Sequence, residues 1–374
     1  MRAAVVGTGF IGAVHVEALR RIGVDVTGVV GSSPDRARAK PGLPEPYESL
    51  EALLSDDRVE VVHLTTPNHL HYPQVKAVLA AGKHVVCEKP LALTSQESGD
   101  LLRLAEASGL VHCTNYNLRF YPLCQEARAR VRRGEIGRVW NAHGTYIQDW
   151  LHQPTDWNWR LDPAQGGSLR AVADIGTHWL DLTGWITGRR VDELLADLYT
   201  VHERRRAPAR PVETFAADQG ELERTERPME TEDIAHILLR YEDGTRGQVT
   251  ISQVSAGRKN HVSFQLDGSG GAIYWNSERH EELWLGHRER PNELLLRDPG
   301  LMDPTTRTDY PGGHAEGFPD TFKQLYRAVY VAVGQGEMPT EPDFPTFADG
   351  HEQILLGEAV AESARTQGWV TVRR

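Results

Sequence analysis

The fold of this chain is decided by the stretch AAVVGTGFIG, residues 3–12. Four apolar residues typical of a buried strand lead directly into three spaced glycines, and a segment with helical periodicity, 13–22, follows. Glycines that end a strand and open a helix are the fingerprint of a dinucleotide-binding turn. Gly7 would form the tight turn, Gly9 would let a pyrophosphate approach the backbone, and Gly12 would let helix and strand pack closely. A glycine-rich turn without a ligand is the weaker interpretation.

Strands and helices continue to alternate over the first 120 residues. Four further apolar segments have the length of strands, with helical segments between most of them: 24–30, 59–64, 83–87 and 110–114. This alternation predicts a parallel, doubly wound α/β sheet. Three of the strands end in polar loops, which begin at Thr65, Glu88 and Asn115. Because parallel strands bring these ends to the same edge as the glycine turn, we predict a cofactor cleft there.

One of these loops is the turn Glu88-Lys89-Pro90. Proline cannot continue a strand ladder, and it biases the residue before it away from helix. Lys89 is therefore expected at a turn above the ligand-binding edge of the sheet. The plainer alternative is a surface lysine in a loop.

The end of the second strand bears on the choice between NAD and NADP. NAD-selective sites place an acid about 20 residues beyond the glycines, where it bonds the adenosine ribose. No acid stands at the end of the second strand in this chain, where the sequence reads GSSPDR over 31–36. Ser32, Ser33 and Arg36 would suit a 2′-phosphate, although Ser33 also suits a helix N-cap. The pattern leans toward NADP or dual use.

Beyond residue 122 the pattern changes to an α+β arrangement. We predict two domains, 1–121 and 122–374, with antiparallel hairpins and a final amphipathic helix in the second: 234–253, 261–275 and 348–363. The final helix is expected to return and brace the first domain. The polar segment 199–230 is predicted to be a mobile insertion, and its arginine run 204–206 a solvated loop.

A helix expected around 169–181 carries a second group of polar residues. Asp174, His178 and Asp181 stand at i, i+4 and i+7, so a regular helix would place them on one face. A buried histidine oriented by a carboxylate is one interpretation. Metal ligation is disfavoured, because no third His or Cys at ligand spacing accompanies the pair. We therefore predict no metal site.

Composition narrows the class of protein. The 374 residues carry 52 acidic and 41 basic side chains, a net charge of −11, which disfavours a nucleic-acid binder. No apolar run approaches the roughly 20 residues of a membrane span, and the N-terminus lacks the pattern of a signal peptide. Three cysteines without metal-like spacing are typical of reduced thiols in a cytoplasmic protein.

Six motifs, taken in order and spacing, identify a likeness that covers nearly the whole chain. They are residues 7–12, Thr66-Pro67-Asn68, Glu88-Lys89-Pro90, Arg119-Phe120, Gly166-Gly167 and 174–181. Together they resemble the glucose–fructose oxidoreductase / myo-inositol dehydrogenase (Gfo/Idh/MocA) family of NAD(P)-dependent enzymes. The resemblance implies an N-terminal Rossmann domain and a C-terminal α+β domain. The large, open, mostly antiparallel sheet of that second domain would serve assembly into a homodimer or homotetramer.

The resemblance also implies the site. Lys89, Asp174 and His178 would be the catalytic trio, Glu88 would lie near the nicotinamide ribose, and a cis peptide before Pro90 would aim Lys89 inward. The residues that we expect to contact the dinucleotide are Gly7, Gly9, Phe10, Ile11, Gly12, Ser32, Ser33, Arg36, Thr66, Pro67, Asn68, His71, Glu88, Lys89, Asn115 and Arg160. Those expected to contact substrate are Lys89, Arg119, Trp157, Asp174, His178 and His314, the last of which would alternatively cap a helix.

The implied activity is reversible oxidation of a secondary alcohol on a sugar, cyclitol or glycoside, with hydride passing to nicotinamide C4. His178 would be the acid/base, and Lys89 would stabilise the oxygen. Two alternatives stay open. One is an NADPH-dependent reductase of a keto sugar such as 1,5-anhydrofructose. The other is a non-catalytic regulator that senses dinucleotide or sugar, which the presence of the complete trio disfavours.

Overall fold

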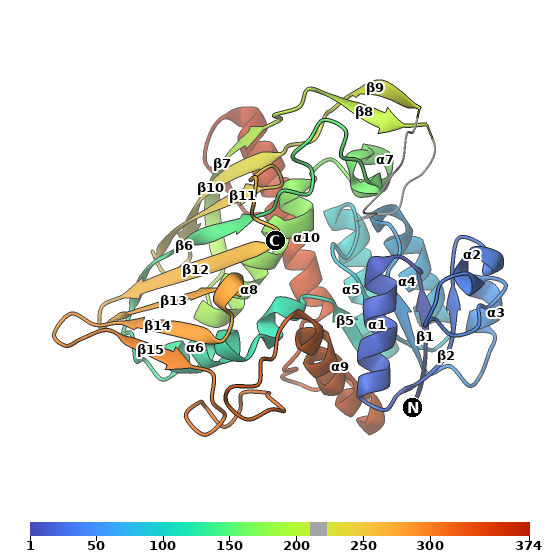
Figure 1. Ribbon diagram of the computed structural model, residues 1–374, viewed down its shortest axis with the longest axis horizontal. Coiled ribbons are helices and arrows are strands. Elements are labelled where there is room, and N and C mark those ends of the chain that lie inside the picture. Colours follow the sequence, from blue (N-terminus) through green and yellow to red (C-terminus); the bar gives the residue numbers. More distant parts are fainter. Residues whose placement is uncertain (210–222) are drawn as a thin grey trace.

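The computed structural model describes residues 1–209 and 223–374, and it contains a parallel sheet and a larger mixed sheet with helices between them (Figure 1). In the described residues the parallel sheet has the order β2-β1-β3-β4-β5. Its strands are β1 (Arg2–Val6), β2 (Asp25–Val30), β3 (Val61–Leu64), β4 (His84–Cys87) and β5 (His112–Thr114). The helices that follow its strands are α1 (Phe10–Arg21), α2 (Pro34–Arg38), α3 (Leu50–Leu54), α4 (His71–Ala80) and α5 (Ser95–Ser108). The predicted Rossmann fold is confirmed.

The second sheet has the order β15-β14-β13-β12-β6-β11-β10-β7-β16 in the described chain. Its strands are β6 (Val139–Ile147), β7 (Val191–Tyr199), β10 (Ile234–Tyr241), β11 (Arg246–Ser252), β12 (His261–Gly268), β13 (Ala272–Asn276), β14 (Glu282–Gly286), β15 (Glu293–Leu296) and β16 (Val370–Thr371). Neighbours are antiparallel except β6 and β11. Burial alternates along β10, so one face packs on the core and the other stays open. The predicted hairpins β10–β11 and β12–β13 are confirmed.

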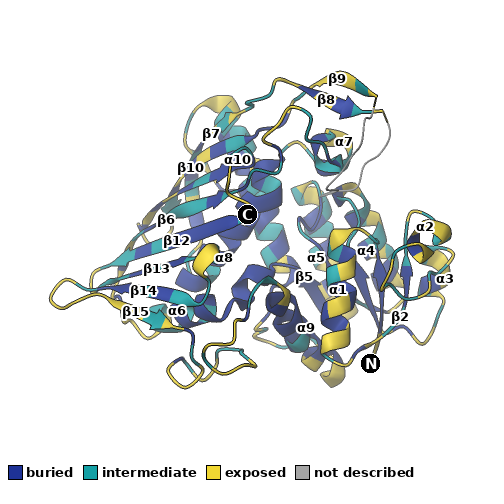
Figure 2. Cartoon of the chain, viewed as in Figure 1, coloured by how far each residue is buried: buried dark blue, intermediate teal, exposed yellow. Residues whose placement is uncertain are grey.

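Helices α6 (Pro122–Arg132) and α8 (Thr177–Thr187) contribute apolar side chains to the core over the inner face of this sheet. Two later helices reach back to the Rossmann sheet: α9 (Phe318–Gln335) packs on α1, and α10 (Phe347–Thr366) packs on α5 and β5. Helix α9 is buried along most of its length (Figure 2). The sequence pattern predicted this return for the last helix alone.

The polar segment 199–230 contains two short paired strands, β8 (Arg204–Pro208) and β9 (Arg224–Pro228). Its centre, 210–222, lies outside the described residues, so the prediction of an insertion there stays a prediction. The prediction that the arginine run is solvated is wrong for Arg205, which is fully buried and paired with Asp233. Alternate side chains of a strand face opposite sides, and Arg205 takes the inward position.

No helix among the described residues is long and apolar enough to cross a bilayer.

Candidate active site

The glycine turn between β1 and α1 leaves room for a pyrophosphate. A Cβ on Gly12 would lie 2.1 Å from the Gly7 carbonyl oxygen, so only glycine fits where the helix meets the turn. A Cβ on Gly9 would meet no atom of the described residues within 4 Å. Gly9 is also the N-cap of α1, and it brings no side chain to the first amides of the helix. Open space beside Gly9, at the N-terminus of α1, suits a phosphate group, so these residues fit the predicted dinucleotide.

Lys89 lies in the turn that follows β4, and its peptide bond to Pro90 is cis, as the resemblance implied. Its ammonium group donates to Oδ1 of Asp174 at 2.9 Å and to the backbone carbonyl of that residue at 2.5 Å. The lysine side chain is only 11% exposed. The alternative of a solvated loop lysine is therefore wrong.

The Asp174 carboxylate receives two further donors. Nε of Arg160 lies 3.0 Å from Oδ1, and Nε2 of Gln253 donates to Oδ2 at 2.8 Å. Burial raises the pKa of Asp174, but Arg160 and Lys89 together hold it well below its usual range. Asp174 is therefore an ionised carboxylate whose hydrogen bonds connect the Lys89 turn to the second sheet.

The helix that carries Asp174 is not regular. Val172–Gly176 is a π-helical turn, η4, which leads into α8. A π turn accommodates an extra residue and so rotates side chains on its two sides relative to each other. Asp174 consequently pairs with Lys89, whereas Asp181 pairs with Arg119. The regular helix expected here is interrupted, and the two carboxylates serve different ion pairs.

His178 lies one turn beyond Asp174, beside the rings of Tyr116 and Tyr146, whose centroids are 5.5 and 6.2 Å from its own. Its Nδ1 is buried and has no hydrogen-bond partner among the described residues. Burial and the Lys89 ammonium lower the pKa of His178 to about 3, while Glu88 acts in the opposite direction. The imidazole is therefore neutral near pH 7 and able to accept a proton.

A buried network behind Asp174 was not foreseen from the sequence. Oε1 of Gln253 accepts from Nη1 of Arg170 at 2.8 Å, and the Arg170 guanidinium pairs with Asp233. Asp233 also pairs with Arg205, so the β8 strand is tied to the same network. Gln253 is the last residue of the predicted hairpin 234–253, and nothing in the sequence spacing marked it or its partners.

Glu88 is buried at the same sheet edge and accepts three hydrogen bonds. Its donors are Nδ2 of Asn115, Nε2 of His15 at 3.0 Å, and the Lys89 amide at 3.3 Å. Burial raises the pKa of Glu88, but the bond from His15 and the nearby positive charges lower it overall. Glu88 and Asn115, both predicted from strand-end loops, thus contact each other.

The remaining strand-end residues tie the loops together. Nδ2 of Asn68 donates to the Gly166 carbonyl at 2.9 Å. The two ring nitrogens of His71 lie 2.7 Å from the Pro90 carbonyl and 2.9 Å from the Thr66 carbonyl, so both are occupied by backbone. These contacts connect the loop after β3 with the Lys89 turn and with the short helix α7 (Pro163–Gly166).

At the end of β2, Ser33 caps α2, and its hydroxyl accepts from the Arg36 amide at 3.3 Å. The N-cap alternative for Ser33 is therefore confirmed. The side chains of Ser32 and Arg36 are exposed. No acidic side chain follows the last residue of β2 directly.

The structure does not gather all of the predicted substrate residues. Arg119 is buried in an ionic cluster with Asp181 and with Asp349 of α10. His314 is exposed, and its Nδ1 lies 3.3 Å from the Gly312 carbonyl. Helix α9 begins at Phe318 with Gly317 as its N-cap, so His314 does not cap it.

Arg160, predicted to contact the dinucleotide, contacts Asp174, and Trp157, predicted to contact substrate, lies half-buried in the same loop. This loop connects β6 to the short helix η3 (Trp159–Leu161). Arg160 also stacks on the neighbouring Trp159, with its guanidinium carbon 4.4 Å from the ring centroid. The loop therefore lies against Asp174.

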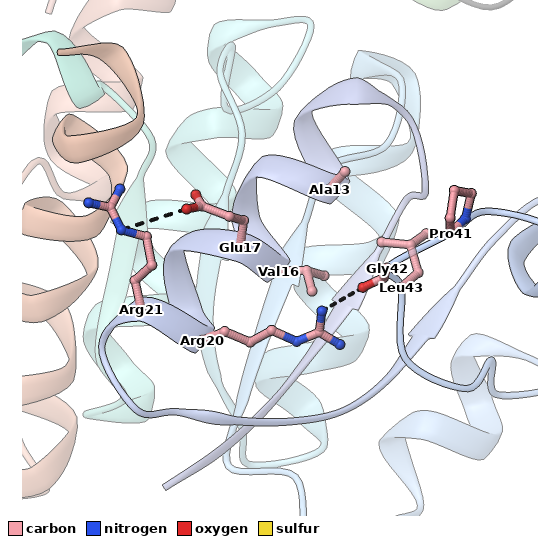
Figure 3. A pocket seen from close by; sticks show the side chains of 8 residues that line it. All are labelled: Ala13, Val16, Glu17, Arg20, Arg21, Pro41, Gly42 and Leu43. Atoms are coloured by element: carbon pink, nitrogen blue, oxygen red, sulfur yellow. Dashed lines mark hydrogen bonds and ion pairs between the residues drawn. The ribbon is translucent and has the colours of Figure 1, made fainter.

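Two hollows lie on or near the Rossmann half of the chain. One of about 480 Å³ lies on the outer side of α1, where Arg20 bonds the Gly42 carbonyl and Arg21 pairs with Glu17 (Figure 3). No predicted site residue lines it. A second, of about 160 Å³, adjoins the site between Pro90, the π turn and α10. Within the described residues, no three His, Cys, Asp or Glu side chains are grouped to hold a metal ion.

Comparison with known proteins agrees with this geometry. Residues 1–116 match the model described as "Oxidoreductase family, NAD-binding Rossmann fold", and 124–274 match the "GFO/IDH/MocA C-terminal domain". The chain is 30% identical over 336 residues to levoglucosan dehydrogenase of Pseudarthrobacter phenanthrenivorans, covering 86% of this chain and 82% of that protein. It is 34% identical over 173 residues to 1,5-anhydro-D-fructose reductase of Ensifer adhaerens, covering 44% of this chain and 50% of that protein.

A solved structure of levoglucosan dehydrogenase in complex with NADH and L-sorbose matches with a TM-score of 0.88 and 27% identity. That match covers 100% of this chain and 99% of the other. The likeness therefore extends over both sheets. The chain belongs to the GFO/IDH/MocA family and is an oxidoreductase with an NAD-binding Rossmann fold.

Proposed function

We propose that this protein is an NAD(P)-dependent dehydrogenase that oxidises a secondary alcohol of a sugar, cyclitol or glycoside. The observation that carries the proposal is the bonding of Lys89 to Asp174 beside a neutral His178, at the sheet edge that also holds the glycine turn. The levoglucosan dehydrogenase relatives support a carbohydrate as substrate.

The dinucleotide would lie along that edge, with its pyrophosphate at the glycine turn and its nicotinamide end near Glu88 and Asn115. The loop at Thr66-Pro67-Asn68 borders the same edge. Bound nicotinamide supplies a hydride acceptor at C4. Trp157 and Arg160 would form a wall for the sugar, because aromatic and guanidinium faces pack on its C–H surfaces.

Lys89 would polarise the reacting oxygen. An ammonium group has three N–H donors, and two of those of Lys89 already bond the carbonyl and Oδ1 of Asp174. The third is left for the substrate hydroxyl. A fixed cation at that oxygen stabilises the negative charge that develops when the proton leaves. Asp174 thus sets the direction of the Lys89 ammonium.

His178 would take the hydroxyl proton at Nε2, because Nδ1 is buried out of reach of solvent. The O–H bond breaks toward the imidazole, the carbinol C–H electron pair leaves as hydride, and a carbonyl forms. Burial and Lys89 lower the pKa of His178, and the carboxylates of Glu88 and Asp174 partly oppose that lowering, so they would stabilise the imidazolium that forms when the proton is taken. In the reverse direction the imidazolium returns the proton.

The test is reduction of NAD and NADP, followed by absorbance of the reduced nicotinamide, across a panel of sugars, anhydrosugars and cyclitols. On the best substrate, Lys89→Ala and His178→Ala should each lower kcat by about 100-fold or more. Lys76→Ala is the control, because Lys76 on α4 pairs with Asp100 on α5, outside the site. Near-wild-type turnover by either site variant, with its fold intact, would contradict the assigned roles.

A second candidate is an NADPH-dependent reductase of a keto sugar, with His178 acting as the acid. The exposed Ser32 and Arg36 at the end of β2, and the likeness to 1,5-anhydro-D-fructose reductase, favour it. The test compares the kcat/KM for oxidation of NADPH by 1,5-anhydrofructose with the kcat/KM for reduction of NADP by each alcohol. A higher value for the keto sugar than for any alcohol would select the reductase. Dinucleotide binding without turnover of any alcohol or keto sugar would instead indicate the regulator.

We also propose a homodimer or homotetramer formed through the open face of the second sheet. Trp140 on β6 and Leu238 on β10 are 58% and 43% exposed there. Light scattering of wild type and Trp140→Glu tests the interface: a monomeric wild type contradicts it. The three buried, unpaired cysteines fit a cytoplasmic location.

A further inference from the structure

A chain of buried polar side chains runs from α9 through the Rossmann core to Glu88. The hydroxyl of Tyr330 lies 3.1 Å from Nε2 of His63, and Nδ1 of His63 lies 3.0 Å from Nδ1 of His15. Nε2 of His15 lies 3.0 Å from Oε1 of Glu88. Both histidines are fully buried, and Tyr330 is 3% exposed. The catalytic roles proposed above use neither histidine.

Aromatic rings of α9 enclose the two histidines. The ring centroid of Tyr326 lies 5.1 Å from that of His15 and 4.8 Å from that of His63, and Phe322 lies 5.8 Å from His15. Figure 1 shows α9 beside α1, which carries His15. The polar atoms of the chain therefore depend on one another for hydrogen bonds, since water is kept away.

The positions of the hydrogens follow from counting donors. Glu88 is a carboxylate that only accepts, so His15 must carry a proton at Nε2. A neutral His15 then accepts at Nδ1, which requires a proton on Nδ1 of His63. Burial lowers the pKa of His63 well below its usual value, so His63 is neutral and accepts at Nε2 from Tyr330. Every hydrogen bond then points toward Glu88.

The opposite arrangement leaves a donor without a partner. If His15 were an imidazolium, Nδ1 of His63 would be the acceptor and Nε2 would donate to Tyr330. The Tyr330 hydroxyl hydrogen would then have no acceptor among the described residues, deep in the core. Because Tyr330 is buried, the chain has no exit to solvent at its α9 end, so it orients hydrogens and does not carry protons through the core.

We propose that Tyr330, His63 and His15 form a one-way chain of hydrogen bonds that fixes Glu88 as a carboxylate beside Lys89. His15 and His63 are then positioning residues for the nicotinamide end of the dinucleotide, a role that rests on the proposed function. The chain also makes α9, which follows the second sheet in sequence, part of the support of the cofactor cleft.

The hydrogen positions can be tested without any ligand. Side-chain ¹⁵N–¹H spectra of the full-length protein, labelled at histidine, distinguish the two neutral tautomers from the imidazolium. We expect His15 as the Nε2–H tautomer and His63 as the Nδ1–H tautomer near pH 7, with His15→Gln and His63→Asn used to assign the signals. An imidazolium at His15, or an Nε2–H tautomer at His63, overturns the proposal.

Binding of NADH, followed by its fluorescence, tests the positioning role. His15→Leu removes the donor to Glu88, and the Kd should rise about tenfold, the effect of one lost bond to a charged group. His15→Gln keeps an N–H near Nε2 and should bind within about threefold of wild type. Equal loss in both variants, with both folded, overturns the proposal.

The matched control is His112→Leu. His112 is also buried in the Rossmann domain, but its Nδ1 accepts from the Phe347 amide at the start of α10. This variant should lose stability and keep the wild-type Kd. Failure of the wild type to bind either NADH or NADPH would refute the proposed function, whereas the tautomers of the free protein would still decide whether the chain exists.

Discussion

The variant Gln253→Leu removes a side chain that holds the Asp174 carboxylate in place but takes no part in proton or hydride transfer. Gln253 is 2% exposed, and its side chain makes two hydrogen bonds, donating to Asp174 and accepting from Arg170, each at 2.8 Å. Leucine has a similar volume and makes neither bond. Each bond to a charged group contributes about 1.5–3 kcal/mol, and neither can be replaced by water at this depth. The free energy of unfolding should therefore fall by about 3–5 kcal/mol.

Only the bond to Asp174 bears on turnover, because that carboxylate directs the Lys89 ammonium. If most of its energy is expressed in the transition state, kcat/KM should fall about 10- to 100-fold. The assays are urea unfolding and initial rates of NAD reduction on the best substrate of the panel.

Gln125→Leu is the control, because Oε1 of Gln125 accepts from the Arg307 amide outside the site. It should lower stability by about 1 kcal/mol and leave kcat/KM unchanged. The reasoning would be refuted if Gln253→Leu lost the expected stability while kcat/KM stayed within about threefold of wild type. Lys89 would then be directed by groups other than the Gln253-supported carboxylate.

Three further predictions concern cofactor choice, pH and the β8 strand. Ser32→Asp should raise the Kd for NADPH at least about tenfold and leave that for NADH nearly unchanged, because like charges repel a 2′-phosphate; tryptophan quenching measures both. The folded-state pKa of His178 is lowered to about 3, so stability from its neutral form is complete above about pH 6.5 and lost as pH falls toward 3. His178→Gln should flatten that loss in urea unfolding between about pH 7 and 4; an unchanged slope contradicts it. Arg205→Met should lower the free energy of unfolding by about 2–3 kcal/mol, because Asp233 keeps only one cation; a change under about 0.5 kcal/mol would mean that the pair contributes little.

Local sequence patterns were enough to predict the fold of the Rossmann half and the residues at the centre of the site. The strand–glycine–helix order of residues 3–22 and the Glu88-Lys89-Pro90 turn each depend on neighbours in the chain. Parallel strands necessarily end at one edge, so the sequence alone predicts that the polar loops after β3, β4 and β5 lie together. The family resemblance added Asp174 and His178 as partners of Lys89.

Local patterns failed where a side chain's environment is set by distant segments. Arg205 reads as part of a charged surface run, yet its strand turns it inward onto Asp233. Arg119 was expected at substrate, and the structure pairs it with Asp181 and with Asp349, 230 residues away.

By itself, therefore, the sequence determined the family, the nucleotide-binding sheet and the residues that converge on Lys89, because periodicity and turn chemistry act between near neighbours. Only the tertiary structure decided which polar groups support them. The π turn that separates Asp174 from Asp181, and the approach of Gln253 across 79 residues, both require packing of the second sheet against its helices. The chain from Tyr330 to Glu88 likewise exists only because α9 folds back onto α1, which buries four polar groups that must then satisfy one another.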